Sequence, residues 1–130
     1  MKKTNTIFDD TKEFALKFDL ISGEETPHIT KHMQIRIDHL QEELDETVQA
    51  VADDDLTEVI DGLLDLIYIA AGTLNMCGVD SQLHWDEIQR ANISKERGIN
   101  PKRGHNVDVI KPEGWVGPDH YKILNWDNNV

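Results

Sequence analysis

Two long helical patterns follow one another with only a few residues between them, and this feature limits the fold more than any other. Apolar residues recur every three or four positions from about residue 30 to residue 51, which is the period of a helix with one apolar face. Residues 56–77 continue without proline up to Gly78, a residue type that favours the end of a helix. Because the connection is so short, the two helices are expected to pack antiparallel as a hairpin.

Polar residues mark the expected beginnings of these helices. Thr30 is the predicted N-cap of the first helix. Asp55, with Glu58 three residues later, resembles a capping box at the start of the second. A further helix is predicted from an N-cap at Asp80 to about Arg97, before Gly98.

The rest of the chain predicts one more helix and a loop. A short helix over about residues 9–18 would place Phe14 and Phe18 on one face. Residues 98–120 hold four glycines and three prolines, which favour an extended loop, and no alternating apolar pattern indicates a strand.

The chain is therefore predicted to be all-α. We expect an antiparallel bundle of about four helices with an irregular C-terminal loop region, about residues 99–130. The length of 130 residues suits a single domain over residues 1–130.

Charge is distributed unevenly along the chain. The formal net charge is −12, and residues 37–89 contain 14 acidic side chains but no lysine or arginine. Such a chain is a poor general binder of nucleic acid, because attraction to phosphate supplies most nonspecific affinity. Its expected partners are metal cations, or anions that reach the protein through metal cations.

Composition also bears on the compartment. The single cysteine, Cys77, cannot form an intrachain disulfide and fits a reducing compartment. The basic N-terminus lacks the apolar stretch of a signal peptide. The apolar run at residues 63–74 contains Asp65 and is too short to span a bilayer. We therefore expect a cytoplasmic protein without a membrane partner.

Carboxylates form a stripe on each helix of the predicted hairpin, because their spacing repeats the helical period. The first stripe consists of Glu42, Glu43 and Glu46, and the second consists of Glu58, Asp61 and Asp65.

The second helix is apolar almost all round, which is typical of a buried helix. Burial of an unpaired ionised carboxylate costs several kcal/mol, on the order of the penalty for any buried ion. No basic residue of the central segment can neutralise Asp61 and Asp65. A divalent cation between the helices would do so, and hard oxygen ligands suit Mg²⁺ or Mn²⁺. A solvated acidic face is the alternative interpretation for Glu42, Asp45 and residues 53–55.

Positive charge returns after the acidic segment, in Arg90-Ala-Asn92-Ile-Ser-Lys95. Asn92 and Lys95 would share a face of the last predicted helix and could contact phosphate. Basic residues in a last helical turn also complement the helix dipole, which is the alternative interpretation. His39, four residues before Glu43, could touch the site.

These motifs, taken in order, resemble the MazG-like and phosphoribosyl-ATP pyrophosphohydrolase-like superfamily of all-α NTP pyrophosphohydrolases. EELDE at residues 42–46 matches the family's E-E-x-x-E element, and residues 58–73 resemble its E-x-x-D helix. Residues 87–95 and 111–120 are similar to the branch that contains phage-type members and dimeric dUTP hydrolases.

The resemblance implies hydrolysis of a (d)NTP to the monophosphate and pyrophosphate, with Mg²⁺ as cofactor and Mn²⁺ as a substitute. It implies Glu43 and Glu46 as catalytic residues, with Glu43 as the general base. The implied metal ligands are Glu42, Glu43, Glu46, Glu58, Asp61 and Asp65, although the second motif leaves open which of Glu58, Asp61 and Asp65 bind directly. The candidate substrate contacts are Asn92, Lys95, Arg36 and Trp115.

The resemblance further implies a homodimer or a dimer of dimers, and this branch suggests dUTP or dCTP, or a house-cleaning role. The strong acidity leaves a second class open, a non-catalytic interaction protein that mimics nucleic acid. A di-iron bundle is disfavoured, because its Glu-x-x-His spacing occurs only at Glu25 and His28, in a loop with Pro27.

Overall fold

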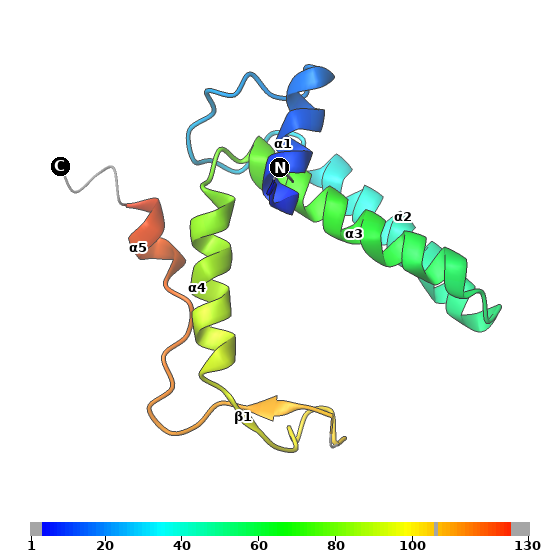
Figure 1. Ribbon diagram of the computed structural model, residues 1–130, viewed down its shortest axis with the longest axis vertical. Helices are drawn as coiled ribbons and strands as arrows, with labels where there is room; N and C mark the ends of the chain where they lie inside the picture. The colour runs from blue at the N-terminus through cyan, green and yellow to red at the C-terminus, as the bar shows by residue number, and fades with distance from the viewer. Residues whose placement is uncertain (1–3, 106, 126–130) are drawn as a thin grey trace. The chain divides into compact units, whose positions relative to one another are not determined.

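A computed structural model describes residues 4–105 and 107–125 of the chain (Figure 1). The described residues are mostly helical and contain one pair of two-residue strands, which confirms the all-α class. The chain divides into two compact units, one up to Ser81 and the other from Gln82 onward.

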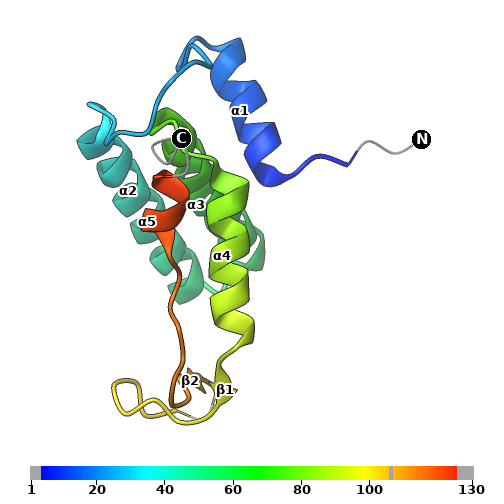
Figure 2. The ribbon, with the colours of Figure 1, turned by 90° about the vertical axis from the view of Figure 1, so that its left-hand side faces the viewer.

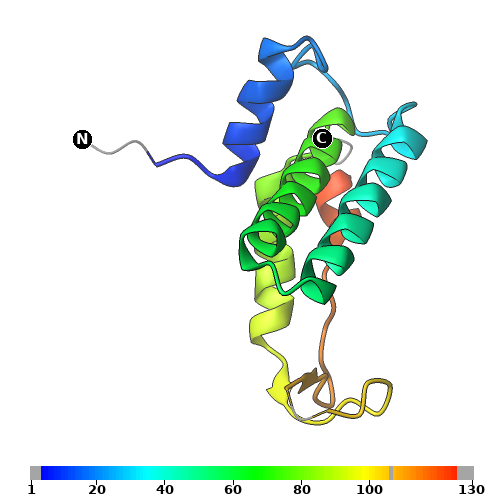
Figure 3. The same cartoon turned by 90° about the vertical axis from the view of Figure 1, so that its right-hand side faces the viewer.

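The first unit is a three-helix assembly. Helix α2 (Met33–Ala52) and helix α3 (Leu56–Met76) form the predicted antiparallel hairpin, and helix α1 (Ile7–Lys17) packs against α3 (Figure 3). The two hairpin helices lie side by side along nearly their whole length (Figures 1 and 3). Residues at the same level along the hairpin axis therefore face one another.

The ends of α3 agree with the sequence prediction. The Asp55 side chain accepts a hydrogen bond of 3.2 Å from the Glu58 backbone N–H, as an N-cap does. The helix ends at Met76, and Gly78 then adopts a φ of 68°, which glycine reaches without steric cost.

The predicted N-cap of α2 is wrong. The helix begins at Met33, and its N-cap residue, His32, makes no side-chain capping bond. The Thr30 hydroxyl instead accepts from the His32 N–H at 3.3 Å, inside the turn that precedes the helix. Because Thr30 is itself 5 % exposed, packing rather than capping accounts for its position.

Helix α1 begins two residues before the predicted start. Thr6 and Asp9 exchange side-chain and backbone hydrogen bonds in a complete capping box, which fixes the first turn. The rings of Phe14 and Phe18 lie 4.8 Å apart on one face, as predicted.

Small side chains form the contact between α2 and α3. Thr47 and Ala50 are the buried residues of α2, and they face α3, whose Gly62 is also buried. Small side chains let the two backbones approach closely, and the larger aliphatic side chains consequently lie on the outside of the hairpin.

The prediction that α3 is buried all round is therefore wrong for the single chain. Several of its large apolar side chains are about half exposed: Ile60, Leu63, Leu64 and Ile67. Asp61 is exposed and Asp65 is half-buried, so burial by this chain alone does not force a cation onto them.

Helix α3 is also longer than the apolar run that it contains. Its 21 residues are long and apolar enough, by length and composition, to cross a membrane, although the run at residues 63–74 alone is not. The core helix of a protein outside the membrane meets the same criterion. Helix α3 also carries three carboxylates, Glu58, Asp61 and Asp65, which are those of the predicted site.

Helix α4 (Ser81–Ile93), which belongs to the second unit from Gln82 onward, ends four residues before the predicted end. Residues Glu96–Arg97 form strand β1 and pair antiparallel with strand β2 (Val109–Ile110), so the prediction that the chain has no strand is wrong here (Figure 2). An unpredicted short helix, α5 (His120–Leu124), follows. His84 of α4 and His120 of α5 are joined by a 2.8 Å contact between their Nδ1 atoms.

Candidate active site

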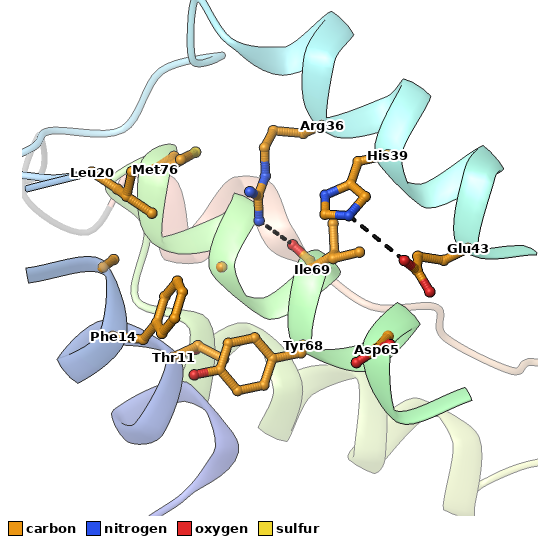
Figure 4. A pocket seen from close by; sticks show the side chains of 12 residues that line it. Thr11, Phe14, Leu20, Arg36, His39, Glu43, Asp65, Tyr68, Ile69 and Met76 are labelled. Atoms are coloured by element: carbon orange, nitrogen blue, oxygen red, sulfur yellow. Dashed lines mark hydrogen bonds and ion pairs between the residues drawn. The ribbon is translucent and has the colours of Figure 1, made fainter. Parts of the chain in front are cut away.

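A pocket of about 390 Å³ opens between the three helices of the first unit (Figure 4). Carboxylates and apolar side chains line opposite parts of it. Glu43 and Asp65 lie at one end, whereas Leu20 and Met76 lie at the other. The side chain of Arg36 lies between these two ends.

Helix periodicity explains how the hairpin lines this pocket. Arg36, His39 and Glu43 follow each other at spacings of three and four on α2, which places them on one face. Asp65 and Ile69 are four residues apart on the facing side of α3. The charged side chains of the lining therefore come from two facing helices that the short connection holds antiparallel.

Glu43 is the carboxylate with the most perturbed environment on this face. Its side chain is 16 % exposed, and His39 Nε2 lies 3.7 Å from its Oε1. Partial burial raises the pKa of Glu43, and the negative charges of Glu46 and Asp65 raise it further, while His39 opposes them. A carboxylate with a raised pKa is better suited to accept a proton than an ordinary one.

Four of the five other predicted carboxylates are more exposed. Glu42, Glu46, Glu58 and Asp61 are exposed to solvent, while Asp65 is half-buried. Within residues 4–105 and 107–125, no three histidine, cysteine or carboxylate side chains lie close enough together to hold a metal ion. The structure thus brings Glu43 and Asp65 to one pocket without forming a complete protein cage for a metal.

The carboxylate oxygens at this end of the pocket nevertheless suit Mg²⁺ as ligands. This ion is usually bound through one or two carboxylates, with water and substrate phosphates as its remaining ligands. The mutual repulsion that raises the pKa of Glu43 is the kind of unfavourable charge that a cation relieves. Glu43 and Asp65 are the two carboxylates of the pocket that would hold it.

Arg36 is fixed across the hairpin. Its Nε donates to Thr73 Oγ1 at 2.9 Å, and its Nη2 donates to the Ile69 carbonyl at 3.0 Å. Partial burial lowers the pKa of its guanidinium, which nevertheless stays protonated in proteins. A lone positive charge is thereby held in the wall of the pocket.

The remaining predicted contacts belong to the second unit. Asn92 is exposed in the last turn of α4, and Lys95 follows after the helix has ended, so the prediction that both lie on one helical face is wrong. The indole Nε1 of Trp115 donates to the Ala91 carbonyl at 2.9 Å. The Lys95 Nζ lies 5.4 Å from the centroid of the Trp115 ring, so these two side chains do meet.

Sequence reasoning missed the contribution of α1 to the pocket. Thr11 is only 1 % exposed, and its hydroxyl accepts a 3.0 Å hydrogen bond from Asn75 of α3. Phe14 packs edge-on against Tyr68, with ring centroids 5.5 Å apart. Gly72 is the sequence signal that points to this region, because a glycine inside a helix often has a packing or functional reason.

The first unit is thus an all-α assembly whose helical hairpin brings two carboxylates to one end of a largely apolar pocket. Residues 12–92, which extend from α1 to the last turn of α4, match the phosphoribosyl-ATP pyrophosphohydrolase family, and the chain belongs to that family. It is accordingly of the nucleotide pyrophosphohydrolase type, a class of hydrolases that act on phosphoric anhydrides. No curated protein matches the chain. Lys95 and Trp115 lie beyond the matched residues.

Proposed function

We propose that the protein is a Mg²⁺-dependent pyrophosphohydrolase that converts a (d)NTP to the (d)NMP and pyrophosphate. The observation that carries this proposal is the position of Glu43 and Asp65, which come from two helices to one end of the pocket. The raised pKa of Glu43 supports its assignment as the general base. Glu46, one helical turn further along α2, is the second proposed catalytic residue.

The proposed reaction is the addition of water across the anhydride bond between the α- and β-phosphates. Glu43 accepts a proton from the attacking water, whose oxygen bonds to phosphorus while the bridging bond breaks. Bound Mg²⁺, or Mn²⁺ as a substitute, would neutralise phosphate charge. Its ligands would come from Glu42, Glu43, Glu46, Glu58, Asp61 and Asp65, with the choice among Glu58, Asp61 and Asp65 as direct ligands left open. Glu43 and Asp65 are the two of these that line the pocket.

Four residues are proposed to contact the nucleotide: Arg36, Asn92, Lys95 and Trp115. Lys95 is proposed to stabilise the negative charge of the departing pyrophosphate, for which an ammonium group is suited. Trp115 is proposed to cover the nucleotide. Arg36 is the one of these residues that lines the pocket itself.

Incubation of the purified protein with each (d)NTP and Mg²⁺ tests this function. Release of pyrophosphate and a monophosphate, abolished by EDTA and restored by Mg²⁺ or Mn²⁺, is the expected result. Release of orthophosphate, or no turnover with any nucleotide, would contradict it. A salt-sensitive complex with a basic protein, together with no turnover, would favour the non-catalytic acidic class.

We infer in addition that the chain assembles as a homodimer or a dimer of dimers. The half-exposed side chains of Leu63, Leu64 and Ile67 on α3 support this, because a contiguous apolar surface is typical of an interface. Light scattering at low concentration should give at least twice the 14.9 kDa of one chain. A monomer would refute the inference.

A further inference from the structure

Arg36 presents hydrogen-bond donors, and only donors, to the pocket. A guanidinium carries five N–H groups and no acceptor. Two of them are used by Thr73 and by the Ile69 carbonyl, which hold the planar group in place. The three that remain, on Nη1 and Nη2, are available to an acceptor on a ligand that fills the pocket.

The geometry of α2 places Arg36 at a distance from the acidic end of the pocket. Arg36 precedes Glu43 by seven residues, which is about 10 Å along a helix. Figure 4 shows His39 between them, and Arg36 nearer to Leu20 and Met76. If phosphates lie at the acidic end, the nucleoside part of the same molecule extends toward Arg36.

The lining around Arg36 suits a flat ring rather than a phosphate. Phe14 and Tyr68 are 43 % and 42 % exposed although they lie in a pocket, so each has surface left to cover. Leu20 and Met76 add apolar surface beside them. Aromatic rings favour stacked or edge-on contacts with other rings, and a nucleobase offers such a ring.

A close approach to Gly72 supports the fixed position of Arg36. A Cβ atom on Gly72 would lie 2.9 Å from Arg36 Nη2, which is too close. Glycine costs about 1 kcal/mol relative to alanine inside a helix. The absence of a side chain at residue 72 therefore gives the guanidinium the room it occupies.

We propose that this pocket holds the nucleobase of the substrate. Arg36 then selects uracil, thymine and guanine, which carry a carbonyl oxygen at the ring position where cytosine and adenine carry an amino group. The proposal rests on the proposed function, because it names the substrate class of the same site. Arg36 donates to O4 of uracil or thymine, or to O6 of guanine. The amino groups of cytosine and adenine place donor against donor at that position, so these bases are disfavoured.

Matched pairs of nucleotides test the proposal. In metal-free calorimetry of the wild-type protein, dUMP should bind at least about tenfold more tightly than dCMP, and dGMP more tightly than dAMP. With Mg²⁺, the ratio of kcat/KM for dUTP over dCTP should show the same preference. Equal binding of the keto and amino partners would overturn the proposal.

Two variants assign the preference to Arg36. Arg36→Met removes the donors, and Gly72→Ala moves the guanidinium while adding helix propensity. Both should bring the ratio of dUMP to dCMP affinity close to one. Ala70→Ser, an exposed change on the same helix, is the control and should leave the ratio at its wild-type value.

Three outcomes separate this proposal from the reaction itself. If Arg36→Met and Gly72→Ala weaken all nucleotides equally, Arg36 contacts a phosphate or sugar common to them, and the base assignment is wrong. If pyrophosphate is released without a keto preference, the base assignment fails while the proposed function stands. If no triphosphate is cleaved but the monophosphates bind with the expected ratio, the base pocket is supported and the reaction fails.

Discussion

Gly62 of α3 lies directly against the hydroxyl of Thr47 on α2. A Cβ atom on Gly62 would overlap that hydroxyl and would lie 3.2 Å from the Thr47 Cβ. The same hydroxyl donates to the Glu43 carbonyl at 2.8 Å. This tight contact between the two helices therefore lies one turn of α2 away from the proposed general base.

Gly62→Ala should consequently destabilise the protein, although alanine favours a helix. Overpacking costs about 1–3 kcal/mol, against about 1 kcal/mol of helix propensity gained. Urea unfolding measures the free energy of unfolding. Thr47→Ala in the Gly62→Ala background removes the overlapping hydroxyl and should recover part of the loss. A Gly62→Ala protein as stable as the wild type would contradict the close packing.

Glu43→Gln should abolish pyrophosphate release while leaving the protein folded. Loss of a general base lowers turnover by about 100- to 10,000-fold, and glutamine keeps nearly the same shape. Asp45→Asn is the matched control, since it removes one negative charge from an exposed position of the same helix. Comparable activity of Glu43→Gln and Asp45→Asn would remove Glu43 from the mechanism.

The raised pKa of the same carboxylate should be measurable in the metal-free protein. Partial burial and the charges of Glu46 and Asp65 raise the pKa of Glu43 above the ordinary 4.5. Carboxyl NMR of the metal-free protein should therefore give Glu43 a midpoint above 4.5. His39→Asn removes the group that lowers this pKa and should move the midpoint higher. A midpoint that stays or falls would contradict this assignment.

The contribution of Glu43 to folding stability should decrease as the pH rises. Because folding raises the pKa of Glu43, its contribution to stability is present below pH 4.5 and is lost as the pH rises through the raised pKa. At pH 7 the Glu43→Gln protein should therefore unfold at a urea concentration no lower than the wild type. A clear loss of stability would indicate a structural role for the Glu43 carboxylate.

The hairpin could be predicted from the sequence because its signals are local. Helical period, the cap at Asp55 and the terminating Gly78 all act within a few residues, and each is present in the structure. The burial of α3 could not be predicted in the same way. Apolar side chains favour burial, but their spacing along one helix does not indicate how much of that helix the rest of the chain covers.

The pocket was less predictable than the carboxylates beside it. Carboxylate stripes repeat along one helix, whereas Thr11 meets Asn75 from 64 positions away, and no local pattern encodes that contact. The end of α4 shows the same limit. Gly98 is a local stop signal, but the pairing of Glu96 with Ile110 ends the helix earlier through a contact between distant residues.

Trp115→Phe should loosen the segment that returns along α4. The indole N–H donates to the Ala91 carbonyl at 2.9 Å, and phenylalanine cannot replace that bond, which is worth about 1 kcal/mol. Amide hydrogen exchange over residues 109–118 should accelerate about fivefold, the equivalent of that energy. Tyr121→Phe, an exposed aromatic change, serves as the control. Unchanged exchange in Trp115→Phe would show that the bond contributes nothing to the order of the segment.

Arg103 should hold Asp108 ionised far into the acidic range. Arg103 Nε lies 2.6 Å from Oδ2 of Asp108, and Nη2 lies 3.0 Å from Oδ1. These bonds, followed by the bond from the Val109 N–H, lower the pKa of Asp108 from 3.8 to about 2. Because folding lowers this pKa, the stabilisation is present above pH 3.8 and is lost as the pH falls toward 2. Carboxyl NMR should give Asp108 a midpoint of about 2 in the wild type and in the control variant Lys102→Met. In Arg103→Met the midpoint should lie nearer 3.8. Equal midpoints in all three proteins would refute the pairing.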